Sequence, residues 1–149
     1  MQQPALDLII DIINQAHDLT LATIRPDGYP QATTVSYAND GLTIYVGVGK
    51  DSQKVNNIRH CDKVSLTINL PYTDWMHIRG ISAAALADIL QDQSDIEHAM
   101  NCLSVRFPQI KQGTTSDFAD EIIFLRIRPQ IVSLLDYEKG FGHTELVKI

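Results

Sequence analysis

Residues 19–48 read LTLATIRPDGYPQATTVSYANDGLTIYVGV, and this stretch decides the fold. Two Asp-Gly pairs, Asp27-Gly28 and Asp40-Gly41, separate runs in which apolar and β-branched residues alternate with polar ones. An Asp-Gly pair between such runs is a strong hairpin signal, because glycine accepts the positive φ that tight turns require. The stretch therefore predicts a three-stranded antiparallel meander over residues 19–25, 29–38 and 42–48.

The apolar spacing outside the meander predicts three helices and three more strands. The helices are expected from Pro4, over residues 53–60, and from a capping box at Ser94–Glu97. The strands are expected at 64–70, 75–90 and 121–135, and residues 109–120 read as a polar loop. Gly80 predicts a bend or bulge, and Gly47 a bulge or the close approach of another molecule.

This order of elements predicts a mainly β (α+β) fold. Six strands, three helices and no alternating βαβ order favour a small closed or split antiparallel β-barrel with flanking helices. With no internal repeat or linker, residues 1–149 are expected to form a single domain.

The composition excludes several classes of function. Twelve Lys and Arg against 18 Asp and Glu give a net charge of 12 − 18 = −6, which argues against nucleic acid as the main partner. Cys61 and Cys102 are the two cysteines and have no CxxC spacing, so neither a disulfide framework nor a metal site is expected. No apolar run has a membrane-spanning length and no targeting segment is evident, so we expect a cytoplasmic protein without a membrane partner.

The most informative chemistry lies in residues 49–57, GKDSQKVNN, between a strand end and a helix start. Backbone amides at a helix N-terminus carry a partial positive charge and bind anions. Ser52 can donate its hydroxyl and Lys54 can supply a full charge, so a phosphate would fit here. The alternative is that Asp51 or Ser52 merely caps the helix and that Lys54 is solvated.

Five segments, taken in order, resemble the pyridoxamine 5′-phosphate oxidase-like, FMN-binding split-barrel family. The similarity lies in their order and spacing more than in any one motif. It implies a six-stranded antiparallel split β-barrel with flanking helices, assembled as a homodimer with FMN in a groove between subunits. The segments are LATIRPDGYP (residues 21–30), QATTVSY (31–37), LTIYV (42–46), DSQKVNNI (51–58) and VSLTI (64–68).

The resemblance also implies which residues bind the cofactor. The family's second and third strands line the flavin ring, largely through backbone, and its Ser-Arg-Lys group grips the phosphate. Trp75 stands where relatives place a glutamine near the ring. The implied cofactor-binding residues are Gln31, Thr33, Thr34, Val35, Val46, Gly47, Ser52, Gln53, Lys54 and Trp75.

The chain departs from the family pattern in its cations. Gln53 replaces the phosphate-binding arginine, and Thr33 and Ala38 stand in place of two further cations. Arg25, Lys50 or Arg79 are the candidates to compensate. The two-arginine motif that binds the substrate phosphate is missing, so oxidation of pyridoxamine phosphate itself is not expected.

The leading hypothesis is a flavin-dependent oxidoreductase that acts on a small molecule, with no catalytic side chain assigned. The alternative is a non-catalytic protein that binds or senses flavin or haem, with His77 as a candidate haem ligand, and deazaflavin is a further cofactor option. His143 is either a proton donor that reaches a partner's site or a disordered terminal residue. A homodimer is expected because a monomer would expose apolar faces at Val46, Trp75 and the last strand.

Overall fold

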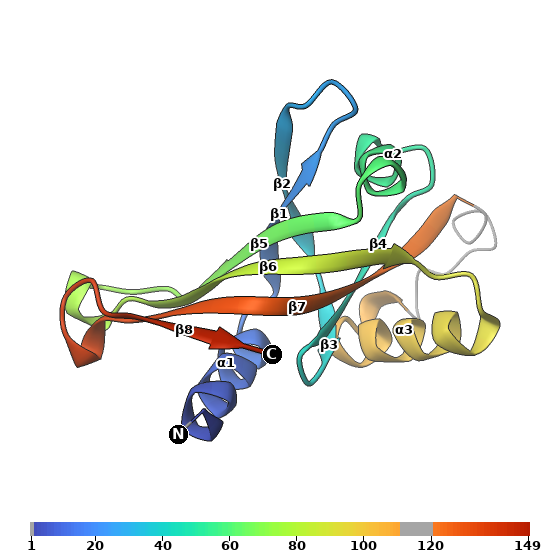
Figure 1. Cartoon of the computed structure of the whole chain (residues 1–149). Coiled ribbons are helices and arrows are strands. Elements are labelled where there is room, and N and C mark those ends of the chain that lie inside the picture. Colours follow the sequence, from blue (N-terminus) through green and yellow to red (C-terminus); the bar gives the residue numbers. More distant parts are fainter. Residues whose placement is uncertain (1, 111–120) are drawn as a thin grey trace.

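The computed structural model describes residues 2–110 and 121–149, and these form three α-helices, two short 3-10 helices and eight strands (Figure 1). The α-helices are α1 (Gln3–Gln15), α2 (Gln53–His60) and α3 (Gln93–Arg106), and the 3-10 helices are η1 (Trp75–His77) and η2 (Tyr137–Lys139). The strands are β1 (Asp18–Ile24), β2 (Pro30–Ser36), β3 (Ala38–Asp40), β4 (Thr43–Gly49), β5 (Lys63–Asn69), β6 (Arg79–Ile89), β7 (Ile122–Asp136) and β8 (Thr144–Lys148).

The strands form one antiparallel sheet in the order β2-β1-β5-β6-β7-β4-β3, with β8 paired to β7. This confirms the mainly β, split-barrel fold, with eight strands in place of the expected six. The two extra strands are β3, which separates from β2, and β8, which returns along β7 after the turn at η2. Most of the expected loop at residues 109–120 lies outside the described residues.

The predicted meander is wrong at its third strand. The first hairpin forms, with Leu21 opposite Thr33, but β4 pairs with β3 and β7 and makes no ladder with β2. Tyr37 explains the break, because its side chain is fully buried and its hydroxyl donates a hydrogen bond to the carbonyl of Ile13, 2.5 Å away. The chain therefore turns a corner at Tyr37, and β3 starts on the other side of the barrel opening.

Gly80 and Gly47 both lie in regular register, so the bulge alternative is wrong at each, whereas the bend at Gly80 and the close approach of another molecule at Gly47 stay predictions. Gly80 is needed because a Cβ there would lie 2.7 Å from the backbone oxygen of Ile68. The register of β6 and β7 instead shifts between Ala84 and Ala85, opposite Pro129. Proline has no N–H to donate, which explains why the ladder is irregular at that point.

Two element starts differ from expectation because aspartate side chains bond nearby amides. Asp74 accepts a hydrogen bond from the Met76 amide, so Trp75–His77 forms η1 and the strand begins only at Arg79. Asp92 accepts from the Ser94 amide, so Asp92 is the N-cap of α3 and the expected Ser94 capping box is wrong.

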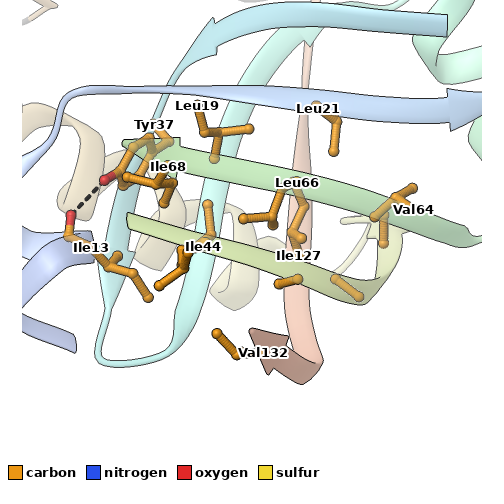
Figure 2. Close-up of a cluster of buried hydrophobic side chains, with 14 of the residues drawn as sticks. Ile13, Leu19, Leu21, Tyr37, Ile44, Val64, Leu66, Ile68, Ile127 and Val132 are labelled. Carbon is orange, nitrogen blue, oxygen red and sulfur yellow. Dashed lines mark hydrogen bonds between the residues drawn. The ribbon is translucent and has the colours of Figure 1, made fainter. Parts of the chain in front are cut away.

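The core lies between the inner face of the sheet and helix α1 (Figure 2). Ile9, Ile12 and Ile13 of α1 are fully buried, and Leu19, Leu21, Leu66 and Ile127 of the strands belong to the same core cluster. In Figure 1, α2 covers one end of the sheet, and β5, β6, β7 and β8 extend away from it as an arm that ends in η1 and η2. None of the described helices has the length and apolar character to span a bilayer.

Candidate functional site

The N-terminus of α2 begins without a side-chain cap. Ser52 is the N-cap residue, yet its hydroxyl makes no capping bond, and the first backbone bond of the helix runs from the Asn56 amide to the Ser52 carbonyl. The amides of the three residues in between, 53–55, therefore have no acceptor among the described residues. This geometry disfavours the alternative in which Ser52 serves only as a helix cap.

A buried amide network joins α2 to the β1–β2 hairpin. Asn57 is fully buried, and its Nδ2 donates to Thr23 Oγ1 at 2.9 Å and to Gln31 Oε1 at 3.1 Å. Its Oδ1 accepts from Gln53 Nε2 at 2.8 Å. Asn57 thus connects two of the predicted cofactor-binding residues, Gln31 and Gln53, through its own side chain.

Two hydroxyls in this region are buried without a partner in the described structure. They are Ser52 Oγ and Thr33 Oγ1, both on residues predicted to bind the cofactor. Thr33 lies on the same face of β2 as Gln31, because side chains alternate along a strand. Each such group costs about 1–3 kcal/mol, which a ligand oxygen or an ordered water at this place would recover.

The two strands predicted to line the ring face each other across the barrel opening. Among the described strands, β2 pairs only with β1, and β4 beyond Tyr45 pairs only with β7, so each presents an unpaired backbone edge. Strands β2 and β4 also lie close together. These edges leave peptide N–H and C=O groups available to a flat ligand.

The side chains of the ring-lining candidates point in different directions. Thr34 is exposed on the outer face of β2, whereas Val35 packs against the core. Val46 is fully buried, so only its backbone is available to a ligand. The expectation that its side chain belongs to an exposed apolar face is therefore wrong. Gly47 is exposed, beside the Phe124 ring.

Lys54 is the cation at this site. No carboxylate of residues 2–110 or 121–149 lies within salt-bridge distance of its ammonium. Arg25 is held by Asp27 at 3.0 Å, and Arg79 by Asp136 at 3.1 Å and Glu138 at 2.7 Å. Two of the three candidates to compensate for the missing cations are therefore engaged elsewhere, and the third, Lys50, is exposed.

Trp75 lies apart from the other predicted residues within one chain. It sits in η1, beyond the far end of the seven-residue strand β5, which itself spans about 20 Å. Strand β5 therefore separates Trp75 from α2 (Figure 1). There its exposed indole lies 6.1 Å from the Phe141 ring, and Phe141 lies 5.5 Å from Tyr137. His143 is exposed in the same turn, with its backbone bonded to Gly140 and Asp136.

His77 stands beside these aromatic residues at the end of the arm. Its Nδ1 lies 2.8 Å from Asp74 Oδ1, and this hydrogen bond raises the pKa of His77. A carboxylate on Nδ1 fixes the imidazole and leaves Nε2 open. The described residues hold no cluster of three or more His, Cys, Asp or Glu side chains suited to a metal ion.

Residues 7–128 match the family model described as pyridoxamine 5′-phosphate oxidase. The chain belongs to this family. No curated protein matches it. Membership of the pyridoxamine 5′-phosphate oxidase family agrees with the observed sheet and with the segments that carried the resemblance.

Solved structures of similar fold include proteins described as binding haem. A haem-binding protein from Mycobacterium smegmatis has a TM-score of 0.81 at 20% identity, and the match covers 97% of this chain and 57% of that one. A conserved hypothetical protein from Mycobacterium tuberculosis has a TM-score of 0.77 at 27% identity, covering 93% and 89%. The haem storage protein HutZ from Vibrio cholerae has a TM-score of 0.68 at 15% identity, covering 86% and 89%.

Asn57 and Thr23 are the residues at this site that the sequence analysis missed. Both are buried polar side chains that connect the predicted residues to one another. The available signal was the spacing of Gln53 and Asn57, since amides four positions apart meet on one helix face. Nothing in the sequence alone marked Thr23.

Proposed function

We propose that this member of the pyridoxamine 5′-phosphate oxidase family binds FMN, with the phosphate at the N-terminus of α2. The observation that carries the proposal is the unpartnered buried hydroxyl of Ser52 at the uncapped start of α2. A second such hydroxyl, Thr33 Oγ1, lies on β2, two residues from the Gln31 that accepts from Asn57 of α2. Buried hydroxyls and free helix amides are the donors that a phosphate accepts from. The ring would then lie along the free edges of β2 and β4.

Each part of the site has a role in this proposal. The amides of residues 53–55 and the Ser52 hydroxyl donate to the phosphate, and the Lys54 ammonium supplies the positive charge. Bound FMN would supply the redox chemistry, as an oxidoreductase cofactor that passes electrons to or from a small molecule. The protein's part is to position the ring and exclude water, so no nucleophilic or acid–base side chain is required.

The proposal includes a homodimer. Large apolar side chains remain exposed outside the core, among them Ile24, Tyr29, Trp75, Ile131 and Leu146. A pocket of about 510 Å³, mostly apolar, lies beside the β1–β2 hairpin on the outer face of β1, β5 and β6. Exposed apolar surface of this kind is typical of a protein interface. A monomer by gel filtration at micromolar concentration would contradict this part.

Flavin titration tests the cofactor. The absorption spectrum of the untreated protein is recorded first, and FMN binding is then followed by quenching of flavin fluorescence. We expect Lys54→Ala to weaken FMN binding by about tenfold or more, since one charge-assisted bond is lost. Lys148→Ala, at an exposed position of β8, is the control and should bind as the wild type does. A colourless protein that takes up no added FMN would refute the proposal.

Haem binding is the second candidate function. The orientation of His77 favours it, because Asp74 holds Nδ1 and leaves Nε2 free beside exposed Trp75 and Phe141. The similarity to a haem-binding and a haem storage protein adds support. Titration with haemin should then give a Soret band that His77→Ala abolishes and His143→Ala preserves. Retention of the full band in His77→Ala would exclude His77 as the ligand.

A further inference from the structure

The phosphate end of the proposed site is rich in neutral amides and poor in charge. Gln53 occupies the first position of α2, and its uncharged Nε2 donates to Asn57 Oδ1 at 2.8 Å. Behind it, Asn57, Gln31 and Thr23 form a closed, uncharged network. The side chains of β1 and β2 that bond to α2, Thr23 and Gln31, are therefore neutral.

The positive charge on this site is correspondingly small. Lys54 contributes one full charge, and the N-terminus of a helix adds a partial charge of roughly half a unit. A phosphate monoester carries about −1.5 to −2 at neutral pH. Arg25 and Arg79 are bound to carboxylates elsewhere, and the charge of the exposed Lys50 is offset by the carboxylate of its neighbour Asp51, so none of the three makes up the difference.

From this charge balance we infer that the site discriminates only weakly between phosphorylated and unphosphorylated flavin. Gln53, held in place by Asn57, is the residue that sets this specificity. Most of the binding free energy then comes from the ring, along the backbone edges of β2 and β4. The ligand class accordingly includes flavins whose side chain ends in an uncharged or singly charged group. The inference rests on the proposed flavin site and goes beyond it.

An arginine at position 53 tests the inference directly. The guanidinium has five N–H donors, so it can keep the bond to Asn57 Oδ1 and still offer donors to a phosphate. Wild type and Gln53→Arg are each titrated with FMN and with riboflavin, and the ratio of the two dissociation constants is the readout. We expect the wild-type preference for FMN to be less than about a hundredfold, and Gln53→Arg to raise it by about tenfold or more.

Helix α3 offers a matched control. Gln93 is the first residue of α3, as Gln53 is of α2, and its Nε2 donates to Glu97 Oε1 at 3.3 Å, also four residues on. Gln93→Arg adds the same charge in the same helical position away from the site, and it should leave the FMN-to-riboflavin ratio unchanged. Thermal unfolding of both variants without ligand confirms that they fold.

Each result has a distinct meaning. A wild type that prefers FMN by more than about a hundredfold, or a Gln53→Arg protein with an unchanged ratio, overturns the assignment of Gln53 while FMN binding stands. An equal rise in the ratio for Gln93→Arg assigns the effect to net charge and also overturns it. A wild type that binds neither flavin overturns the proposed function together with the inference.

Discussion

Replacement of Asn57 by alanine should destabilise the protein more than the position of this residue in the short helix α2 suggests. The change removes three hydrogen bonds, of 2.8, 2.9 and 3.1 Å, from a fully buried side chain. Each contributes about 0.5–1.5 kcal/mol net, and a buried partner left unpaired costs about 1–3 kcal/mol. Since Gln53 is exposed and can turn to water, we expect a total loss of about 2–4 kcal/mol.

Urea denaturation measures this loss, with Asn56→Ala as the matched control. Asn56 is the exposed neighbour on the same helix, so its replacement changes helix propensity equally but breaks no side-chain bond in the described structure. For a chain of 149 residues, a loss of this size lowers the melting temperature by about 5–15 °C. If the two variants unfold within about 0.5 kcal/mol of each other, the network does not stabilise the fold as argued.

Three further perturbations test the packing. Gly80→Ala should lower the free energy of unfolding by about 1–3 kcal/mol, because its Cβ would lie 2.7 Å from the Ile68 oxygen. Gly47→Ala is the control, since its Cβ meets the nearest atom at 3.5 Å. Equal melting temperatures of the two variants would contradict this prediction. Burial raises the pKa of Tyr37 to about 12, so between pH 10 and 12 the unfolded chain ionises first and the free energy of unfolding falls. Tyr37→Phe should reduce this loss of unfolding free energy between pH 10 and 12, measured by urea denaturation at each pH. The same pH dependence in wild type and variant would contradict the role of Tyr37. Arg106 donates to the carbonyls of Ile13, Asn14 and Ala16, so Arg106→Met should cost about 2 kcal/mol and speed amide exchange in α1, while Arg59→Met should do neither.

Local features of the fold were predictable because local chemistry decides them. Gly28 and Gly41 adopt φ of 91° and 59°, as the turns at the two Asp-Gly pairs require. Helix α2 spans the expected residues because Val55 and Ile58 have helical spacing and bury one face. These signals lie within a few positions of each other in the chain.

The order of the strands was not predictable from such signals. Val46 pairs with Leu125, and neither residue carries any mark of the other. Tyr37 looks like one more strand residue, yet its burial against α1 breaks the second strand in two. The same holds for the site, where Ser52 and Lys54 belong to a recognisable segment but Thr23 enters only through the folded hairpin.

Strand β7 has a consequence for how the protein is made. It pairs with β4 through residues 122–127, with β6 along most of its length and with β8 through residues 131–135. The ribosome synthesises the chain from its N-terminus, so β4 and β6 leave the ribosome before β7, the strand that pairs with both. During that interval the edges of β4 and β6 that β7 will occupy stay open and can pair with another chain, until β7 has left the exit tunnel.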